Sequence, residues 1–305
     1  MSKLSNNAAI AASLLATVIC WGGNNAETKW LVATWPPVGT GCMRFLVAGT
    51  LLLGILRFTS WLGQYQPLTA PMRRDIFLRP AFCLAAYMVA FCWALHLTQA
   101  SHVALCLGAS PIWALLWEEP PQRSWSSARR YGAAMLACTG IIVLFWPALS
   151  SGKSNLFGDV LALISSVLWS AFSRQSRLLG PKIAALELAA HSMWMSGVWL
   201  LPIGLVEIIF HRFTFDRQHL AVQSLCIIFG GVVPYAFWNN ALRHWQASRV
   251  LLFNNLIPVT TATWAHFVLG EPLTPTFWLA MILIVAGVVL GQMDWTKIFK
   301  LPENF

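Results

Sequence analysis

The chain has 305 residues, of which 57% are hydrophobic and only 10% are charged, and its formal net charge is +9. Ordinary soluble domains carry about 25% charged residues, so this composition, with a mean hydropathy of +0.63, excludes a water-soluble fold. Because no soluble domain remains to present a basic face, the net charge does not indicate nucleic-acid binding.

Apolar stretches long enough to cross the roughly 30 Å hydrocarbon core of a bilayer recur along the whole chain. The first stretch resembles the core of a signal peptide, but further spans follow and "WGGNNAETKW" is not a small-residue cleavage site, so we expect it to be retained. The sequence thus predicts an all-α integral membrane protein. Its ten transmembrane helices are expected at residues 7–26, 37–57, 77–97, 101–118, 130–149, 157–174, 184–209, 220–243, 247–269 and 274–293.

Lys and Arg residues are distributed unevenly between the two sides of this arrangement. Fifteen of the 20 fall on the side of the termini, four fall opposite (Lys29, Lys153, Arg212 and Arg217), and Arg44 lies inside a span. Because cytoplasmic loops carry an excess of Lys and Arg, we expect both termini in the cytoplasm and the protein in the inner (plasma) membrane.

One ten-residue segment, called the repeated phrase below, occurs twice in similar form in the chain. "ALHLTQASHV" at 94–103 and "ALRHWQASRV" at 241–250 share six residues at an offset of 147. At almost the same offset, 148, Trp21 matches Trp169 and Gly49 matches Gly197. The chain therefore consists of two homologous halves.

Each half contains five spans, and because five is odd, the second half must enter the membrane upside down. We expect a first repeat at 1–150, a second, inverted repeat at 151–296, and a cytoplasmic tail at 297–305. Inverted repeats are typical of secondary transporters, whose substrate site lies near the midplane between the halves.

The sequence contains no motif for disulfide bonding, metal binding, ATP hydrolysis or hydrolytic catalysis. The seven Cys residues lie in apolar spans without C-x-x-C spacing, so they indicate neither a disulfide framework nor a zinc site. There is no G-x-x-x-x-G-K-[ST] loop, which excludes ATP as the direct driver, and neither H-E-x-x-H nor a nucleophile elbow occurs. We expect no enzymatic activity, no metal site and no cofactor.

The segment "YAFWNNALRHWQASRVLLFNNLIPVTTATWAHFVLGEPLTPTFWLAMILIVAGVVLGQ" resembles the second EamA repeat of the drug/metabolite transporter superfamily. The first half is similar through "ICWGGNNAETKWL" and "CMRFLVAGTLLLG". The resemblance implies a ten-helix carrier of small metabolites, of the kind that includes bacterial amino-acid exporters. The chain departs from the pattern in one place. Glu271 follows Pro258 by 13 residues, whereas Glu119 follows Pro111 by only 8, so helix four is expected to be short and the equivalence of the two Glu residues is open.

Two prolines at equivalent depth are candidate kink or gating residues. Pro111 and Pro258 each remove a backbone N–H and free a carbonyl four residues earlier, at Leu107 and Asn254. In lipid such a carbonyl needs a partner or a water-lined cavity. The prolines are therefore expected to border a central cavity, and simple packing kinks are the alternative.

The candidate substrate-binding residues combine aromatic and amide side chains. Tyr235, Trp238 and Asn239 fall at i, i+3 and i+4 and share one helical face, which is the kind of surface that lines a pocket for a small amphipathic solute. Interhelical packing is the alternative for all of them. The pseudo-symmetric counterparts in the other helices, together with amides that precede Pro258, complete the predicted set: Trp21, Asn24, Tyr87, Trp169, Ser173, Asn254 and Asn255.

Three ionisable residues inside spans are candidates for coupling or anchoring. Arg44 costs about 2.5–3.5 kcal/mol at the bilayer centre on insertion scales, so we expect it to face protein, water or a route by which it snorkels to the interface, as an anchor or as a receptor for a substrate carboxylate. Glu187 and His191 lie one turn apart and are candidates for sharing a proton, unless Glu187 reaches the interface.

These observations predict a secondary transporter of small organic metabolites, most simply an exporter of amino acids or related amphipathic compounds, working by alternating access. An integral membrane enzyme acting on lipid-linked substrates through Glu187, His191 and His266 is the alternative, and an assembly or sensor protein is a third. The expected partners are a small-molecule substrate and the lipid bilayer, with the protein a monomer or weak dimer.

Overall fold

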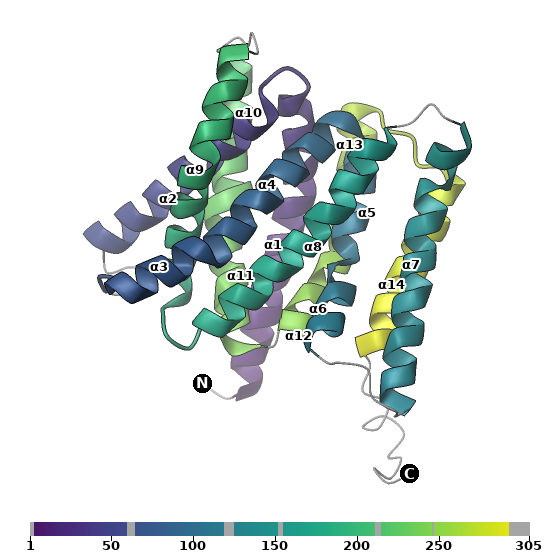
Figure 1. Ribbon diagram of the computed structural model, residues 1–305, viewed down its shortest axis with the longest axis horizontal. Helices are drawn as coiled ribbons and strands as arrows, with labels where there is room; N and C mark the ends of the chain where they lie inside the picture. Colours follow the sequence, from purple (N-terminus) through teal and green to yellow (C-terminus); the bar gives the residue numbers. More distant parts are fainter. Residues whose placement is uncertain are drawn as a thin grey trace.

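The computed structural model describes residues 3–59, 65–118, 125–151, 155–210, 215–245 and 247–292. Across these ranges the regular structure is entirely helical, and the chain passes ten times through one bundle (Figure 1). Six helical segments of the described chain are long and apolar enough to cross a membrane. The protein is an all-α, multi-pass membrane protein of the kind predicted.

The first half makes five passes. They are α1 (Lys3–Val32), α2 (Pro37–Phe58), α3 (Ala70–Leu78) with α4 (Pro80–Leu97), α5 (Ala100–Gly108) with α6 (Ser110–Glu118), and α7 (Trp125–Ser151). The end of the bundle where α1 begins is called the terminal end here, and the opposite end, where α4 turns into α5, the distal end (Figure 1).

The second half repeats this order in the opposite direction, starting from the distal end. Its passes are α8 (Leu156–Leu179), α9 (Ala185–Phe210), α10 (Arg217–Leu225) with the π-helix η1 (Cys226–Val232) and α11 (Val233–His244), α12 (Ala247–Leu251) with the 3₁₀-helix η2 (Leu252–Leu256) and α13 (Ile257–Leu269), and α14 (Pro275–Gln292).

Several passes differ from the continuous helices that the hydropathy predicts. The third, fourth, eighth and ninth are interrupted, and the interruptions lie beside Pro80, Pro111, Pro234 and Pro258, because a proline supplies no N–H to the preceding turn. Conversely, α1 continues past residue 26, the predicted end of the first span, and ends at Val32. The fourth pass is described as far as Glu118, while Glu119 and the tail at 297–305 lie outside the described residues.

The two halves pack against each other through glycines that the repeat had paired. A methyl group built on Gly49 in α2 would lie 2.6 Å from the backbone nitrogen of Trp194 in α9, and one on Gly197 in α9 would lie 2.6 Å from the Leu46 side chain in α2. These matched positions let equivalent helices of the inverted repeats approach closely, as small residues do in membrane bundles.

The second such contact, between α7 and α14, gives a stability prediction. A methyl group on Gly140 would lie 2.9 Å from the carbonyl oxygen of Ala280, whereas one on Gly132 in the same helix meets nothing within 4 Å. We expect Gly140→Ala to destabilise the protein by about 1–3 kcal/mol, since the helices must move apart. Thermal unfolding in detergent measures this, and Gly132→Ala, the matched control, should unfold at or above the wild-type temperature. Equal effects at both positions would contradict the close contact.

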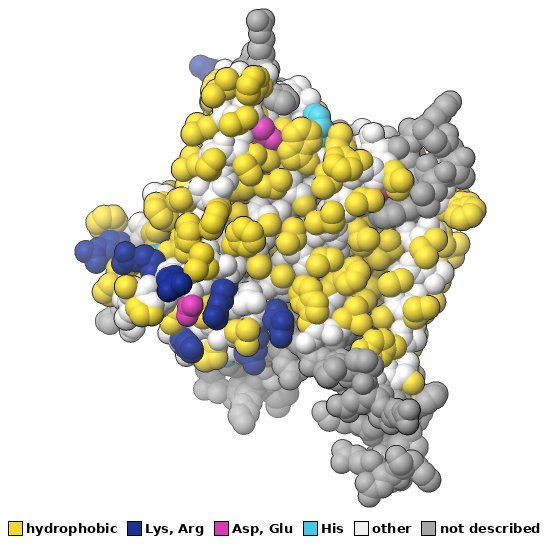
Figure 2. Space-filling model, in the orientation of Figure 1, with side chains coloured by type: hydrophobic (Ala, Val, Ile, Leu, Met, Phe, Trp, Pro, Cys, Tyr) yellow, Lys and Arg dark blue, Asp and Glu magenta, His cyan; other side chains and the backbone are white. Residues whose placement is uncertain are grey.

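The outside of the bundle is suited to lipid. Hydrophobic side chains cover most of the face in Figure 2, while Lys and Arg side chains gather toward its lower left, around α3 and the terminal end. Large apolar side chains remain strongly exposed, among them Phe210 and Phe267 at 80% each. The apolar surface with basic residues concentrated toward one end is what a membrane protein with asymmetric loops requires.

Candidate functional site: a cavity between the two halves

A small, partly enclosed cavity lies between the halves. Helices of both halves contribute to its wall, which is mostly aromatic and aliphatic with a few amides and one cation. The lining residues are Trp21, Asn24, Asn25, Arg44, Phe45, Tyr87, Met88, Phe91, Leu107, Trp169, Gly230, Tyr235, Asn254 and Ile257.

The aromatic part of the wall is built around two tryptophans related by the repeat. The rings of Trp21 in α1 and Trp169 in α8 meet edge to face, with centroids 5.1 Å apart. Tyr235 lies 5.6 Å from Trp21, and Tyr87 lies 5.2 Å from Trp169. Contacts of this geometry are worth about 0.5–1.5 kcal/mol beyond burial, so the rings form a rigid surface.

Three irregular stretches of backbone meet at this cavity. Gly230 belongs to the π-helix η1, Asn254 to the 3₁₀-helix η2, and Leu107 lies at the end of α5, just before the break at Ala109. Irregular helical turns free backbone groups, which at membrane depth are tolerated only inside protein or around a water-filled space. Their convergence indicates a polar interior in an otherwise apolar bundle.

Hydrogen bonds fix several polar groups of the wall. Trp21 Nε1 donates to the carbonyl of Gly230 (3.0 Å), and Asn25 Nδ2 donates to Thr261 Oγ1 (3.0 Å). Asn254 Nδ2 donates to Ser110 Oγ (3.3 Å), while its Oδ1 is buried without a partner among the described residues. Each of these bonds joins one half to the other, so the cavity wall also links the repeats.

The structure separates the predicted substrate-binding residues into two layers. Six of them line the cavity: Trp21, Asn24, Tyr87, Trp169, Tyr235 and Asn254. The others that can be placed lie behind this wall. Trp238 is fully buried against Trp21 and Trp169, at 5.1 and 5.3 Å, and Asn239 Nδ2 donates to the carbonyl of Tyr235. Ser173 is also fully buried. Of the residues on the predicted face of α11, Tyr235 lines the cavity, and Trp238 and Asn239 pack directly behind it.

The carbonyls that the two prolines were expected to free both have hydrogen-bond partners in the structure. Ser110 Oγ donates to the carbonyl of Leu107, the group that Pro111 was expected to free. In the second half, the N–H of Ile257 bonds to the carbonyl of Asn254 in a tight 3₁₀ turn. Gly108 packs against the Pro258 ring, since a methyl group there would lie 3.1 Å from its Cγ. The side chains of Pro111 and Asn255 lie outside the described set.

Glu187 and His191 lie away from the cavity wall, in the first turns of α9 near the terminal end. Glu187 Oε1 accepts a hydrogen bond from the backbone N–H of Gln66 (2.6 Å), whereas the His191 ring lies beside Tyr65, with centroids 6.5 Å apart. His266, the third group of the enzyme hypothesis, bonds to the carbonyl of Glu271 at the distal end. The groups of the proposed acid–base set are therefore distributed over opposite ends of the bundle.

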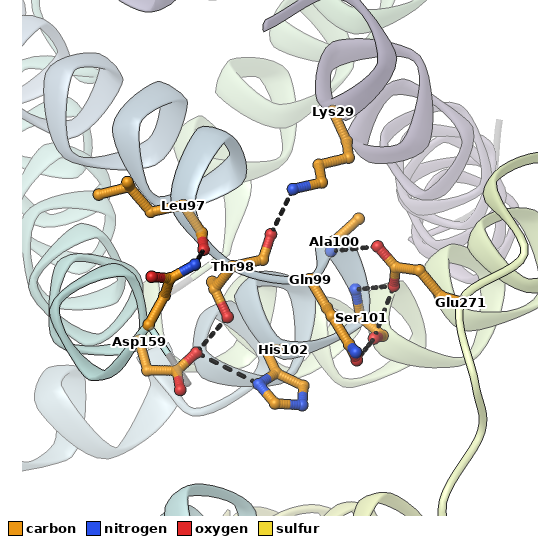
Figure 3. A network of polar contacts seen from close by, with 10 residues as sticks. Lys29, Leu97, Thr98, Gln99, Ala100, Ser101, His102, Asp159 and Glu271 are labelled. Carbon is orange, nitrogen blue, oxygen red and sulfur yellow. Dashed lines mark hydrogen bonds and ion pairs between the residues drawn. The ribbon is translucent and has the colours of Figure 1, made fainter. Parts of the chain in front are cut away.

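The repeated phrase forms the turn between α4 and α5, and Figure 3 shows this turn surrounded by side chains from both halves. Asp159 of α8 accepts hydrogen bonds from Thr98 Oγ1 (2.5 Å) and from His102 Nδ1 (3.2 Å). Glu271 accepts from the backbone N–H groups of Ala100 (2.8 Å) and Ser101 (3.2 Å), and from Ser101 Oγ (2.8 Å). Two carboxylates of the second half thus hold a first-half turn.

Local sequence explains how Glu271 reaches this position. Gly270 closes α13 in the left-handed conformation, with φ of 69°, and the chain turns so that the Glu271 carboxylate lies at the start of α5. A carboxylate there satisfies unpaired N–H groups and complements the helix dipole. Glu207 does the same for α2, accepting from Val38 N (2.6 Å) and Gly39 N (3.0 Å).

A basic residue anchors each copy of the repeated turn. Lys29 Nζ donates to the carbonyl of Thr98 (2.8 Å) at the distal end, and Arg177 Nη1 donates to the carbonyls of Leu242 (2.9 Å) and Arg243 (3.1 Å) at the terminal end. Lys29 and Arg177 are related by the offset of 148 that relates Trp21 to Trp169. The two halves are therefore similar in the hydrogen bonds that hold this turn as well as in sequence.

Sequence reasoning missed part of the site. Among the lining residues, Asn25 is the 148-residue counterpart of Ser173, and Gly230 belongs to a Gly-Gly pair near Pro234, so both carried a detectable signal. Phe45, Phe91 and Ile257 look like any other core residue in an apolar span. The roles of Glu207 and Glu271 depend on tertiary contacts that no local pattern reveals.

Comparisons with known proteins agree with this architecture. The EamA-like transporter family matches residues 8–146 and again 156–291. An "Uncharacterized transporter" of Archaeoglobus fulgidus is 23% identical over 288 residues, covering 91% of this chain and 95% of that protein. A "Probable amino-acid metabolite efflux pump" of Salmonella typhimurium is 25% identical over 294 residues, covering 91% and 92%. An "Uncharacterized inner membrane transporter" of Escherichia coli is 25% identical, covering 91% and 89%.

A solved crystal structure shares the fold, with a TM-score of 0.65 at 16% identity, over 94% of this chain and 98% of the other. Since the family match covers nearly the whole chain in two copies, the ten-pass bundle with its internal cavity is a transporter and not an enzyme. The chain belongs to the EamA-like transporter family.

Proposed function

We propose that this protein is a secondary active exporter of small organic metabolites, with amino acids and related amphipathic compounds as its substrate class. The two five-helix halves would rock around the cavity and expose it alternately to either side. The protein would reside in the inner (plasma) membrane with both termini in the cytoplasm, as a monomer or weak dimer.

The cavity is the observation that supports this proposal most directly. Both halves line it, irregular backbone from three passes meets there, and its wall combines Trp and Tyr rings with Asn amides. Such a wall accommodates a solute with an apolar body and a few hydrogen-bonding groups. The Salmonella relative is named for amino-acid metabolite efflux, which favours this class over sugars or inorganic ions.

Reconstitution tests the substrate class. Purified protein in liposomes loaded with an unlabelled amino acid should accumulate the same labelled amino acid by exchange, whereas protein-free liposomes should not. We expect the substrate to be recovered chemically unchanged. Failure to exchange any amino acid or related metabolite would reject the substrate class. The direction of transport is measured separately, as secretion of the substrate by cells that overproduce the protein.

The orientation has a separate test. Lys182 is exposed near the terminal end and Arg217 is exposed at the distal end. In a background without native cysteines, a membrane-impermeant thiol reagent added outside intact cells should label Arg217→Cys and should label Lys182→Cys only after lysis. The reverse pattern would place the termini outside.

A further inference from the structure

Arg44 is a buried cation in the wall of the cavity. It lies in α2, its side chain is 2% exposed, and it is the only Lys or Arg among the described residues that line the cavity. A charged group in this position has lost most of its hydration, which is costly unless another charge or several hydrogen bonds replace the water.

The protein itself meets only part of this requirement, because the Glu27 carboxylate of α1 is near enough to attract Arg44 electrostatically but forms no direct ion pair with it among the described residues. A guanidinium has five N–H donors, and among the described residues the bond printed for Arg44 runs from Nη2 to Thr28 Oγ1 (2.7 Å). Arg44 Nε is buried and has no hydrogen-bond partner in the described part of the chain. None of the ion pairs found within 4 Å in that part includes Arg44.

The hydrogen bond described for Arg44 connects it to Thr28 of α1, which lies beside the lining residues Asn24 and Asn25 in the same helix. Thr28 Oγ1 accepts from Arg44 and donates to the backbone carbonyl of Asn24 (2.7 Å), so the guanidinium is held in place from α1. A fixed guanidinium with unused donors is preorganised for a planar, two-oxygen acceptor, which a carboxylate supplies.

The rest of the wall contains no competing charge. No Asp or Glu is found among the lining residues that the structure describes, so an ammonium group would meet only amide oxygens, such as the unpartnered Asn254 Oδ1, and aromatic faces. A ligand carboxylate would therefore be the only formal counter-charge within the cavity, and the wall offers no comparably strong partner for an amine.

We propose that Arg44 binds the carboxylate of the transported molecule, so that the substrates are small organic acids and zwitterions with a free carboxylate on an aromatic or branched apolar body. The proposal rests on the transport function proposed above and narrows its substrate class. The carboxylate is required for recognition, whereas the α-amino group is replaceable by a hydroxyl.

A ligand series on the wild-type protein tests this without any mutation. Binding of phenylalanine, 3-phenyllactate and phenylalaninamide, and of the matching leucine compounds, is measured by tryptophan fluorescence of the purified full-length protein and by competition in liposome exchange. We expect the amino acid and the hydroxy acid to bind within a few-fold of each other, and the amide about tenfold or more weaker, since it cannot form the charge-assisted pair.

Substitution of Arg44 should remove that preference. Arg44→Gln is expected to weaken binding of both acids by at least about 30-fold while leaving the weak amide binding unchanged. Thr28→Val keeps the guanidinium but removes its support, and should cost a few-fold for the acids only. Arg79→Gln, at an exposed arginine of α3–α4, is the matched control and should keep the wild-type preference. If Arg44→Gln fails to fold, the ligand series on the wild-type protein and the Thr28→Val variant test the role of Arg44 instead.

The outcomes separate this inference from the proposed function. Exchange of panel compounds in which the amides compete as well as the acids would overturn the role of Arg44 and leave the transporter intact. If no acid, zwitterion or amide of the panel is bound or exchanged, the proposed substrate class itself is wrong, and the carboxylate proposal falls with it.

Discussion

Replacing Trp169 with alanine is expected to reduce substrate exchange to the background of protein-free liposomes. Trp169 is 4% exposed, lines the cavity, and is the ring that most of the aromatic cluster shares. Its ring partners within about 6 Å are Trp21, Tyr87, Phe172, Tyr235 and Trp238. Removing such a side chain typically costs about 3–5 kcal/mol and leaves a void where the substrate would contact the wall.

Two further variants separate the wall from general stability. Trp169→Phe keeps an aromatic face and should retain part of the exchange, with a raised KM and a small loss of thermal stability. Trp146→Ala removes a tryptophan that is 63% exposed on the lipid side of α7, and should leave exchange unchanged. Wild-type exchange by a folded Trp169→Ala protein would show that the aromatic cluster is structural only.

The duplication is what allowed much of this site to be predicted from sequence. Trp21 and Trp169 look ordinary singly, but as a matched pair at one offset they had to occupy equivalent depths in two inverted halves, and their rings meet. Gly49 and Gly197 were found in the same way, and they mark a close contact between equivalent helices. Matching two residues through the repeat therefore constrains their positions in the bundle more strongly than the hydropathy of their spans does.

The residues behind the cavity wall show where that reasoning stops. A helical-wheel argument placed Trp238 and Asn239 beside Tyr235, but it fixes only angles around one helix and does not say how closely the neighbouring tryptophans approach. The π-helix η1 before α11 gives no separate hydropathy signal either. Asp159 and Glu207 lie near the ends of predicted spans, and their role as acceptors for other helices depends on partners more than 50 residues away.

The last prediction concerns the two ends of the cavity. Glu271 at the distal end and Glu187 at the terminal end both belong to the second half, and both accept backbone N–H groups of the first half. If the halves rock, the Glu271 contacts must break to open the distal end and the Glu187 contact must break to open the terminal end. Changing either carboxylate to an amide should therefore shift the equilibrium in opposite directions.

A cysteine in the cavity wall measures this shift. With Met88→Cys as the reporter in a Cys-free background, Glu271→Gln should raise labelling from the distal side about tenfold, and Glu187→Gln should raise labelling from the terminal side by a similar factor. A charge-assisted hydrogen bond contributes about 1.5–3 kcal/mol, of which a glutamine retains part. Asp75→Asn, in an exposed contact within α3–α4, serves as the control and should change neither rate.

The double variant provides the decisive comparison. In a two-state rocking motion, weakening the contacts at both ends destabilises both closed ends by similar amounts, so the free-energy difference between the two open states stays the same. The double variant Glu271→Gln with Glu187→Gln should therefore return the ratio of the two labelling rates to near the wild-type value. If the two carboxylates instead stabilised the fold locally, the losses of thermal stability in the two single variants would add in the double variant. The ratio of the two labelling rates would then stay at the value of the single variant with the stronger effect. Labelling that rises from the same side in both single variants would exclude opposed gates, because contacts at opposite ends of one cavity cannot both restrain the same opening.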